Sequence, residues 1–116
     1  MADQSHLDLL KQGKDVWNKW RRMHPHVQPD FSRASLRGVH FEGTDLTDAD
    51  FTEADLSGAD FTDATLVRAN FSGADLTIAC FRRADLRLAN LRQADMRLAT
   101  LDEADLGGAD LTATKK

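Results

Sequence analysis

The chain of 116 residues is poor in three features that fix the class of many proteins. It has no long apolar run, so neither a transmembrane helix nor membrane contact is expected. Its first residues lack the basic-then-apolar layout of a secretory signal, which favours a cytoplasmic location. The single cysteine, Cys80, excludes an internal disulfide and fits that compartment. We interpret Cys80 as a small structural residue and not as a reactive thiol.

Signatures of catalysis and of cofactor binding are also missing. No glycine-rich phosphate loop is present. His24 and His26 flank Pro25 and could be imagined as metal ligands with His6 or His40, but this spacing belongs to no standard zinc site. We therefore expect a non-enzymatic protein without a catalytic residue, a cofactor or a metal.

What the chain has instead is a strict five-residue period. From Phe31 to Leu111 every fifth residue is Phe, Leu or Met, which gives seventeen centres: six Phe, ten Leu and Met96. A helix needs a period near 3.6 and a strand a period of 2, so this pattern fits neither and predicts a solenoid of five-residue units. Ala stands two residues before the centre in fourteen units, and Asp or Asn stands directly before it in twelve. We call the residue directly before the centre the slot, and the two residues after it the first and second outward positions.

The pattern A-[D/N]-[L/F]-X-X resembles the pentapeptide-repeat proteins. It is seen in Ala54–Gly58 (ADLSG) and in Ala84–Leu88 (ADLRL), and the resemblance covers residues 29–113. The resemblance implies an all-β solenoid, a right-handed quadrilateral β-helix in which four units make one square coil. Seventeen units then make about four coils, followed by a polar tail at 114–116.

If four units complete one coil, residues twenty apart stack in columns. The predicted core then has two facing Phe columns and two Leu columns inside a narrow tube. These columns are Phe31, Phe51 and Phe71; Phe41, Phe61 and Phe81; Leu36, Leu56 and Leu76; Leu46, Leu66 and Leu86.

Residues 1–28 are predicted to form an amphipathic capping helix and a linker. The helix is expected between Ser5 and Met23, with Ser5 and Asp8 as an approximate capping box. Its apolar stripe comprises Leu9, Leu10, Val16, Trp17, Trp20 and Met23. Among these, Leu10, Trp17 and Trp20 are the cap residues expected to cover the first coil, and the prolines at 25 and 29 end the helix.

The other end of the solenoid has no such segment after Leu111. Two arrangements stay open: a frayed edge guarded by Lys115 and Lys116, or two chains that meet end to end. The second is slightly favoured, as a homodimer through the C-terminal coil, because the resemblance implies it.

Charge argues against a nucleic-acid partner and against DNA mimicry. Ten acids of the repeats occupy slots, where a short side chain can bond the backbone; without them the outward positions carry six acids and eight arginines. A mimic of duplex DNA needs dense acids on its faces. A girdle around one coil, and not a stripe along one face, is formed by Arg82, Arg87, Arg92 and Arg97, with Arg83 beside it. We interpret them as solubilising residues that pair with Asp102, Glu103 and Asp63.

Ile78 and Leu98 are twenty apart at second outward positions, so they should stack on one wall, with Arg97 beside them. We take these three residues as the candidate interface. The expected function is a protein-interaction or scaffold module of a bacterial cytosol, with an unknown protein partner. Two alternatives stay open: a DNA-mimicking inhibitor or protector of DNA gyrase, which the resemblance implies, and a purely structural module.

Overall fold

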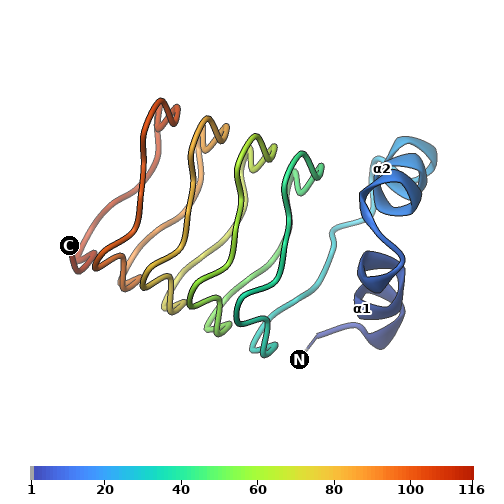
Figure 1. The fold of residues 1–116 in the computed structure, drawn as a ribbon, viewed down its shortest axis with the longest axis horizontal. Helices are drawn as coiled ribbons and strands as arrows, with labels where there is room; N and C mark the ends of the chain where they lie inside the picture. Colours follow the sequence, from blue (N-terminus) through green and yellow to red (C-terminus); the bar gives the residue numbers. More distant parts are fainter. Residues whose placement is uncertain (1) are drawn as a thin grey trace.

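The computed structural model describes residues 2–116 and shows a stack of coils with two short helices at its N-terminal end (Figure 1). The helices are α1 (Gln4–Lys11) and α2 (Lys14–Met23). The coils follow from residue 29 onward, and the C-terminus lies at the far end of the stack.

Each slot residue forms a parallel β-bridge with the slot residue twenty positions later. The series runs from Asp30 with Asp50 to Asp95 with Lys115. Twenty residues are four units, so the predicted circuit of four units per coil is confirmed. We number the coils 1 (residues 30–49), 2 (50–69), 3 (70–89) and 4 (90–109).

The bridges are isolated, and the described residues contain no continuous strand. Strands do not become longer because the two outward residues of each unit form the turn between neighbouring walls. Only the slot residue of each unit is then left to form a bridge. The second outward residue has positive φ in every unit, from Arg33 (61°) to Ala113 (59°). This is the left-handed region, which most side chains disfavour.

The slot side chains hold these corners. In all twelve units with a slot Asp or Asn, the side-chain oxygen accepts a hydrogen bond from the backbone N–H two residues later. Asp and Asn have the short acceptor that this turn requires. The expected bonding of slot acids to the backbone is therefore confirmed.

Side chains fill the interior of the tube. The twelve predicted core residues are all buried, Leu36 with 7% of its surface exposed and the others fully. Phe41, Phe61 and Phe81 stack with ring centroids 4.7 and 4.9 Å apart, and they meet the facing Phe column edge-on at 5.7 to 5.9 Å. Beyond Met96 the centres Leu101, Leu106 and Leu111 are only partly buried.

The N-terminal segment differs from the single helix expected between Ser5 and Met23. It breaks at Gly13, whose φ of 99° suits glycine, and α2 begins at Lys14. The N-cap of α1 is Asp3, which accepts from the N–H and the hydroxyl of Ser5, so the predicted capping box is wrong. Since the break resets the helical phase, Val16 and Met23 point outward and are exposed.

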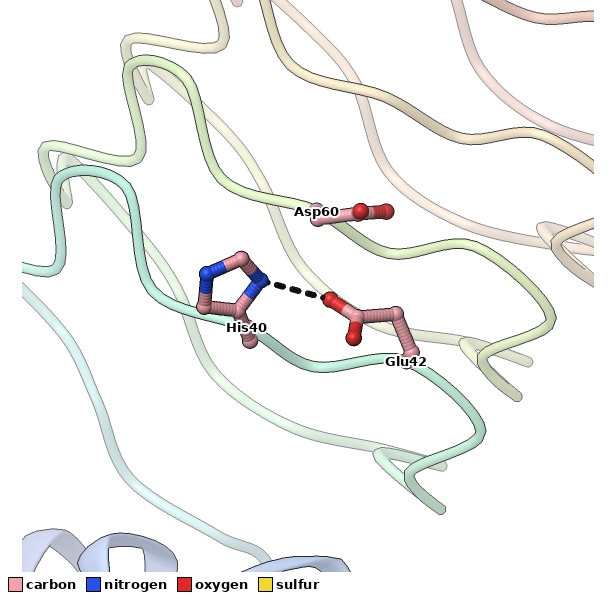
Figure 2. A group of neighbouring side chains, drawn as sticks. All are labelled: His40, Glu42 and Asp60. Atoms are coloured by element: carbon pink, nitrogen blue, oxygen red, sulfur yellow. Dashed lines mark hydrogen bonds and ion pairs between the residues drawn. The ribbon is translucent and has the colours of Figure 1, made fainter.

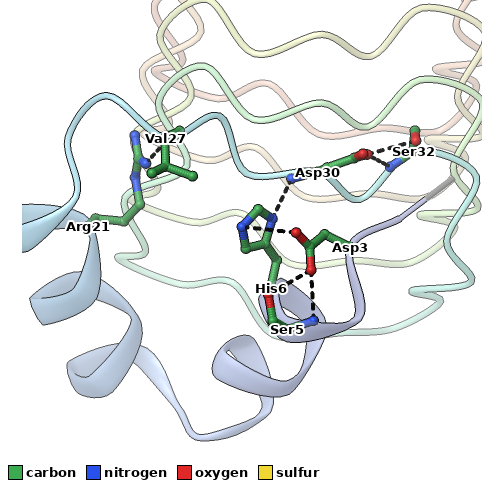
Figure 3. A network of polar contacts seen from close by, with 7 residues as sticks. All are labelled: Asp3, Ser5, His6, Arg21, Val27, Asp30 and Ser32. Carbon is green, nitrogen blue, oxygen red and sulfur yellow. Dashed lines mark hydrogen bonds and ion pairs between the residues drawn. The ribbon is translucent and has the colours of Figure 1, made fainter.

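Both helices lie across coil 1. Trp17 is fully buried against Phe31, and Leu10 and Trp20 are partly buried against the core. His6 Nδ1 accepts from the Asp30 N–H at 2.9 Å (Figure 3). These contacts cover both the apolar interior and part of the backbone edge of coil 1.

The side chains of α2 bond the same edge on another side of coil 1. Asn18 accepts from the Asp45 N–H at 2.8 Å and donates to the Gly43 carbonyl at 3.0 Å. The buried Arg21 donates to the carbonyl of Val27 at 2.6 Å (Figure 3). It also donates to the carbonyl of Thr47 at 3.1 Å. Main-chain groups that a further coil would pair are thus bonded by helix side chains.

Candidate functional site

The structure brings the three predicted interface residues together on one wall. Ile78 in coil 3 is 62% exposed and Leu98 in coil 4 is 82% exposed. They line a shallow hollow of about 460 Å³ with Arg97, Thr77 and Lys116. We call Ile78, Arg97 and Leu98 the coil 3–4 patch.

This patch is continuous with the open C-terminal end. Leu98 and Lys116 also line a second hollow of about 400 Å³, in which apolar side chains of the last units are accessible. The remaining lining residues are Met96, Ala99, Leu101, Leu106 and Leu111. One apolar surface therefore extends from the side wall onto the end face.

The polar tail is shorter than predicted. Lys115 forms a bridge with Asp95 and donates its N–H to the Ala94 carbonyl at 2.9 Å, so the ladder continues into 114–116. The Thr114 hydroxyl donates to the Leu111 carbonyl at 2.7 Å. The repeat pattern stops at 113, but backbone pairing needs no particular side chain and continues to Lys115.

Ile78 has an unusual backbone conformation for its side chain. Its φ is 63°, in the left-handed region, where a residue branched at Cβ is rare. Five units place Gly at this position, without strain. The fold therefore keeps an exposed Ile at a position where Gly or Asn is easier to accommodate.

Arg97 is held close to the wall by its neighbour in the slot. Its guanidinium donates to both carboxylate oxygens of Asp95, at 2.9 and 2.6 Å. These bonds lower the pKa of Asp95 from its ordinary 3.8 to about 2. The ion pair partly neutralises the charge of Arg97. The neighbouring Leu98 therefore lies beside an ion pair and not beside a free cation.

The arginine girdle pairs differently from the prediction. Arg87 bonds Asp85 at 2.7 Å and Arg92 bonds Asp110 at 3.3 Å, so slot acids are the partners and not Asp102 or Glu103. Arg87 and Arg97 follow their own slot acids by two positions, which brings the charges close. Arg92 follows Asn90 and reaches the slot acid of the next coil in the same column. The predicted pairing of Asp63 is found with Arg83, beside the girdle, at 2.8 Å.

A set of ion pairs between adjacent coils was predicted from the sequence only for Asp63. At second outward positions, acids and arginines twenty apart join adjacent coils. The pairs are Arg33 with Glu53 (3.2 Å), Arg68 with Asp48 (2.7 Å) and Arg83 with Asp63 (2.8 Å). The spacing of twenty was the signal that could have found them. They leave few outward acids free to imitate phosphates.

One group among residues 2–116 has the residue types of a metal site: His40, Glu42 and Asp60. His40 Nδ1 is 2.9 Å from Glu42 Oε1, and Asp60 lies on the next coil (Figure 2). Partial burial acts to raise the pKa of Asp60, but hydrogen bonds from Thr62 outweigh it and lower this pKa below its ordinary value.

The other histidines are not part of this group. His6 is buried and its Nδ1 already accepts from the Asp30 N–H, and His24 contacts the Trp20 ring at a tilted angle. The structure therefore does not bring His24 and His26 together with His6 or His40.

Neither helix is long and apolar enough to cross a bilayer.

The family profile described as pentapeptide repeats matches the chain in eight copies, over residues 30–66, 44–77, 54–93 and 79–115. The chain belongs to the pentapeptide-repeat family. The resemblance inferred from the sequence is thus confirmed. Members of the pentapeptide-repeat family are generally structural or interaction proteins without enzymatic activity.

Solved structures of pentapeptide-repeat proteins match the fold. A protein of Nostoc PCC 7120 has 31% identity and a TM-score of 0.68, with 84% of this chain and 92% of that chain covered. A protein of the Arabidopsis thaliana thylakoid lumen has 28% identity and a TM-score of 0.69, with 73% and 59% covered. These neighbours imply a right-handed quadrilateral β-helix.

The plasmid-mediated fluoroquinolone resistance protein QnrB1 has a TM-score of 0.69 at 24% identity, a likeness of fold alone. The match covers 73% of this chain and 47% of that protein, so the chain spans about half its length. Among curated protein sequences the comparison found no significant match.

Proposed function

We propose that this pentapeptide-repeat protein is a non-enzymatic interaction module that binds a protein partner through the coil 3–4 patch. The observation that carries the proposal is Ile78, a branched apolar side chain that is exposed and held at φ 63°. A residue kept against both solvation and backbone preference points to a function at that position. The neighbouring Leu98 extends the apolar surface.

The solenoid supports this role mechanically. The side chains of the patch project from adjacent coils whose main chains are bonded to each other, as in the bond from the Ile78 N–H to the Arg97 carbonyl at 3.1 Å. A surface fixed in this way loses little conformational freedom on binding. The ion pair of Arg97 with Asp95 keeps a polar rim next to the apolar residues.

The open end offers a second contact, with another copy of the chain. We infer a homodimer through the C-terminal coil, supported by the partly buried Leu101, Leu106 and Leu111 at an end that no segment covers among the described residues. At the opposite end we assign α1 and α2 the role of a cap, supported by the bonds of His6 and Asn18 to coil 1.

Two other functions are weaker on this evidence. Protection of DNA gyrase by DNA mimicry is disfavoured because outward acids such as Asp48 and Asp63 are paired with arginines of the adjacent coil. A purely structural module leaves the exposed Ile78 unexplained. A cytosolic location is part of the proposal and rests on the free thiol of Cys80.

The proposal is tested by the double variant Ile78→Glu/Leu98→Glu in affinity capture and in size measurement by light scattering. Leu88→Glu is the matched control, because Leu88 is also an exposed leucine at a second outward position (57% exposed, φ 61°) but lies on the opposite wall. A partner lost with the double variant and retained with Leu88→Glu supports the patch. Equal capture by both variants contradicts it, and a supercoiling assay with gyrase tests the alternative.

A further inference from the structure

The cluster of His40, Glu42 and Asp60 lies on coils 1 and 2 and shares no residue with the coil 3–4 patch. His40 occupies a slot, Glu42 is the first outward residue after it, and Asp60 is the slot residue stacked on His40 in coil 2. Figure 2 shows the imidazole and the Glu42 carboxylate on one coil, with the Asp60 carboxylate on the next. The solenoid thus brings three metal-ligand types together from two coils.

Among the described residues, these two carboxylates meet no lysine or arginine, in contrast to Asp85 and Asp95 among the slot acids. Asp85 receives Arg87 two residues later, but the same position after Asp60 holds Thr62. Thr62 also lies twenty residues after Glu42, where other outward acids meet an arginine. Within residues 2–116, no lysine or arginine pairs with Glu42 or Asp60.

We propose that His40, Glu42 and Asp60 form a binding site for one divalent transition-metal ion of the zinc type, which joins coil 1 to coil 2. An imidazole with two carboxylates suits Zn²⁺ and its neighbours in the transition series, whereas Ca²⁺ and Mg²⁺ select sites of oxygen ligands alone. The ion supplies the positive charge that the sequence omits here.

The geometry fits such an ion after small side-chain rotations. With zinc–ligand distances of about 2.0 to 2.2 Å, neighbouring ligand atoms in a tetrahedral site are about 3.3 Å apart. The His40 Nδ1 and Glu42 Oε1 atoms are already 2.9 Å apart, and the ligand atoms of all three residues lie within 4.8 Å of one another. His40 and Glu42 are exposed, so their side chains are free to turn toward Asp60.

Asp60 is held in place for this role. One of its oxygens, Oδ1, accepts from the N–H of Thr62 at 2.9 Å and from its hydroxyl at 2.6 Å. These bonds fix the direction of the carboxylate, as partners of metal ligands usually do. Cys80, the next slot residue in the column, lies outside the three-residue group and contacts the Thr62 hydroxyl at 3.4 Å.

The test is a calorimetric titration of the untagged full chain with ZnCl₂, together with its melting temperature with and without the metal. We expect one Zn²⁺ per chain and a rise in melting temperature, because the ion binds only the folded arrangement. His40→Asn and Asp60→Asn are expected to weaken binding by about tenfold or more and to abolish the rise. Asn is a natural slot residue in this fold, at 70 and 90, so both variants are expected to fold.

Two control variants separate this site from other zinc ligands. His24→Asn/His26→Asn removes the histidines that flank Pro25, and Cys80→Ser removes the only thiol. Both should bind Zn²⁺ like the unchanged chain. The proposal is overturned if the unchanged chain takes up no Zn²⁺ at about 1 mM. It is equally overturned if either control loses the binding while His40→Asn keeps it.

Discussion

Trp17 donates its indole N–H to the main-chain carbonyl of Asp45 at 2.7 Å, across 28 residues of sequence. The same indole is fully buried and meets the Phe31 ring at 5.6 Å. One side chain therefore both covers the apolar interior of coil 1 and bonds its backbone edge. Trp17 thus contributes both packing and a hydrogen bond to the attachment of α2, together with the hydrogen bonds of Asn18 and Arg21.

We predict that Trp17→Phe lowers the free energy of unfolding by about 2 kcal/mol, because the Asp45 carbonyl loses its donor while most of the packing stays. Trp17→Ala removes both and should cost about 3 to 5 kcal/mol. Trp20→Phe is the control, since Trp20 is only partly buried, and should cost less than about 1 kcal/mol. Urea unfolding measures all three. Equal losses for the two phenylalanine variants would show that the hydrogen bond contributes nothing.

Ile78 should be replaceable with a gain in stability. Its φ of 63° disfavours a side chain branched at Cβ, so Ile78→Asn is expected to raise the free energy of unfolding by about 1 kcal/mol. Leu98→Asn, at φ 64° but without the branch, should give a smaller gain. Thermal unfolding compares the two variants. A loss for Ile78→Asn would mean that the contacts of Ile78 outweigh its strain.

Asp75 tests what the slot requires. Its Oδ1 accepts from the Thr77 N–H at 3.0 Å and from the Thr77 hydroxyl at 2.7 Å, and an Asn oxygen can accept both bonds. Asp75→Asn should therefore stay within about 0.5 kcal/mol of the unchanged chain or stabilise it, since a negative charge leaves the column of Asp55 and Asp95.

Asp75→Ala is the matched variant that removes the acceptor altogether. We expect it to cost about 1 kcal/mol, because the N–H and hydroxyl of Thr77 lose their partner. Melting temperatures measured at neutral pH rank the two variants. A large loss for Asp75→Asn would show that the ionised carboxylate itself is needed.

Phe61 has stacked rings on both sides, Phe41 at 4.7 Å and Phe81 at 4.9 Å. Phe61→Ala should cost about 3 to 5 kcal/mol, from the lost burial and from the cavity that is left. Phe61→Leu keeps much of the volume and should cost about 1 to 2 kcal/mol. Leu101→Ala, in the same column but only partly buried, is the control and should cost less than Phe61→Ala in chemical unfolding.

Acid should weaken the C-terminal coils through Asp95. Its pKa is about 2 in the folded chain against an ordinary 3.8, because Arg97 hydrogen-bonds the ionised carboxylate. The unfolded chain thus binds this proton more readily, and the contribution of Asp95 to stability is present above about pH 4 and lost as pH falls toward 2.

Urea unfolding between pH 2 and pH 7 measures this dependence, and the variants Asp95→Asn and Arg97→Gln should both make the stability curve flatter on its acid side. Arg22→Gln is the control, because Arg22 lies on α2 and takes part in none of the ion pairs among residues 2–116. If the free energy of unfolding at acid pH depends on pH in both test variants as it does in the unchanged chain, Asp95 does not contribute to the pH dependence.

The regular part of the fold could be read from the sequence, and the irregular part could not. The period of five predicts Phe61 in the interior and Asp75 at a corner because the same local geometry recurs in every unit. The break at Gly13 was missed because a helical wheel shows only in which direction each side chain points. It does not show the shape of the end of coil 1 that these side chains cover. Met23 consequently pointed outward and not into the core.

For the candidate surfaces, the spacing by twenty predicted which residues stack in one column. It did not predict which acid each arginine pairs with. It stacked Ile78 with Leu98 and could have paired Arg68 with Asp48. The partners expected for the girdle arginines did not follow from this spacing, and the expectation was wrong for Asp102 and Glu103. A flexible side chain selects its partner by reach and rotamer, which a periodic pattern does not contain.

The sequence by itself determined a solenoid of five-residue units, since a strict recurrence of one apolar residue in five fills a narrow tube with identical turns. The square coil of four units was implied by the family resemblance and is shown by the bridges between residues twenty apart. The tertiary structure alone decided where single side chains meet: the indole of Trp17 on the Asp45 carbonyl, and the imidazole of His40 beside Glu42 and Asp60. Such contacts depend on the packing of separate segments and on the directions of individual side chains, and no period in the chain encodes those directions.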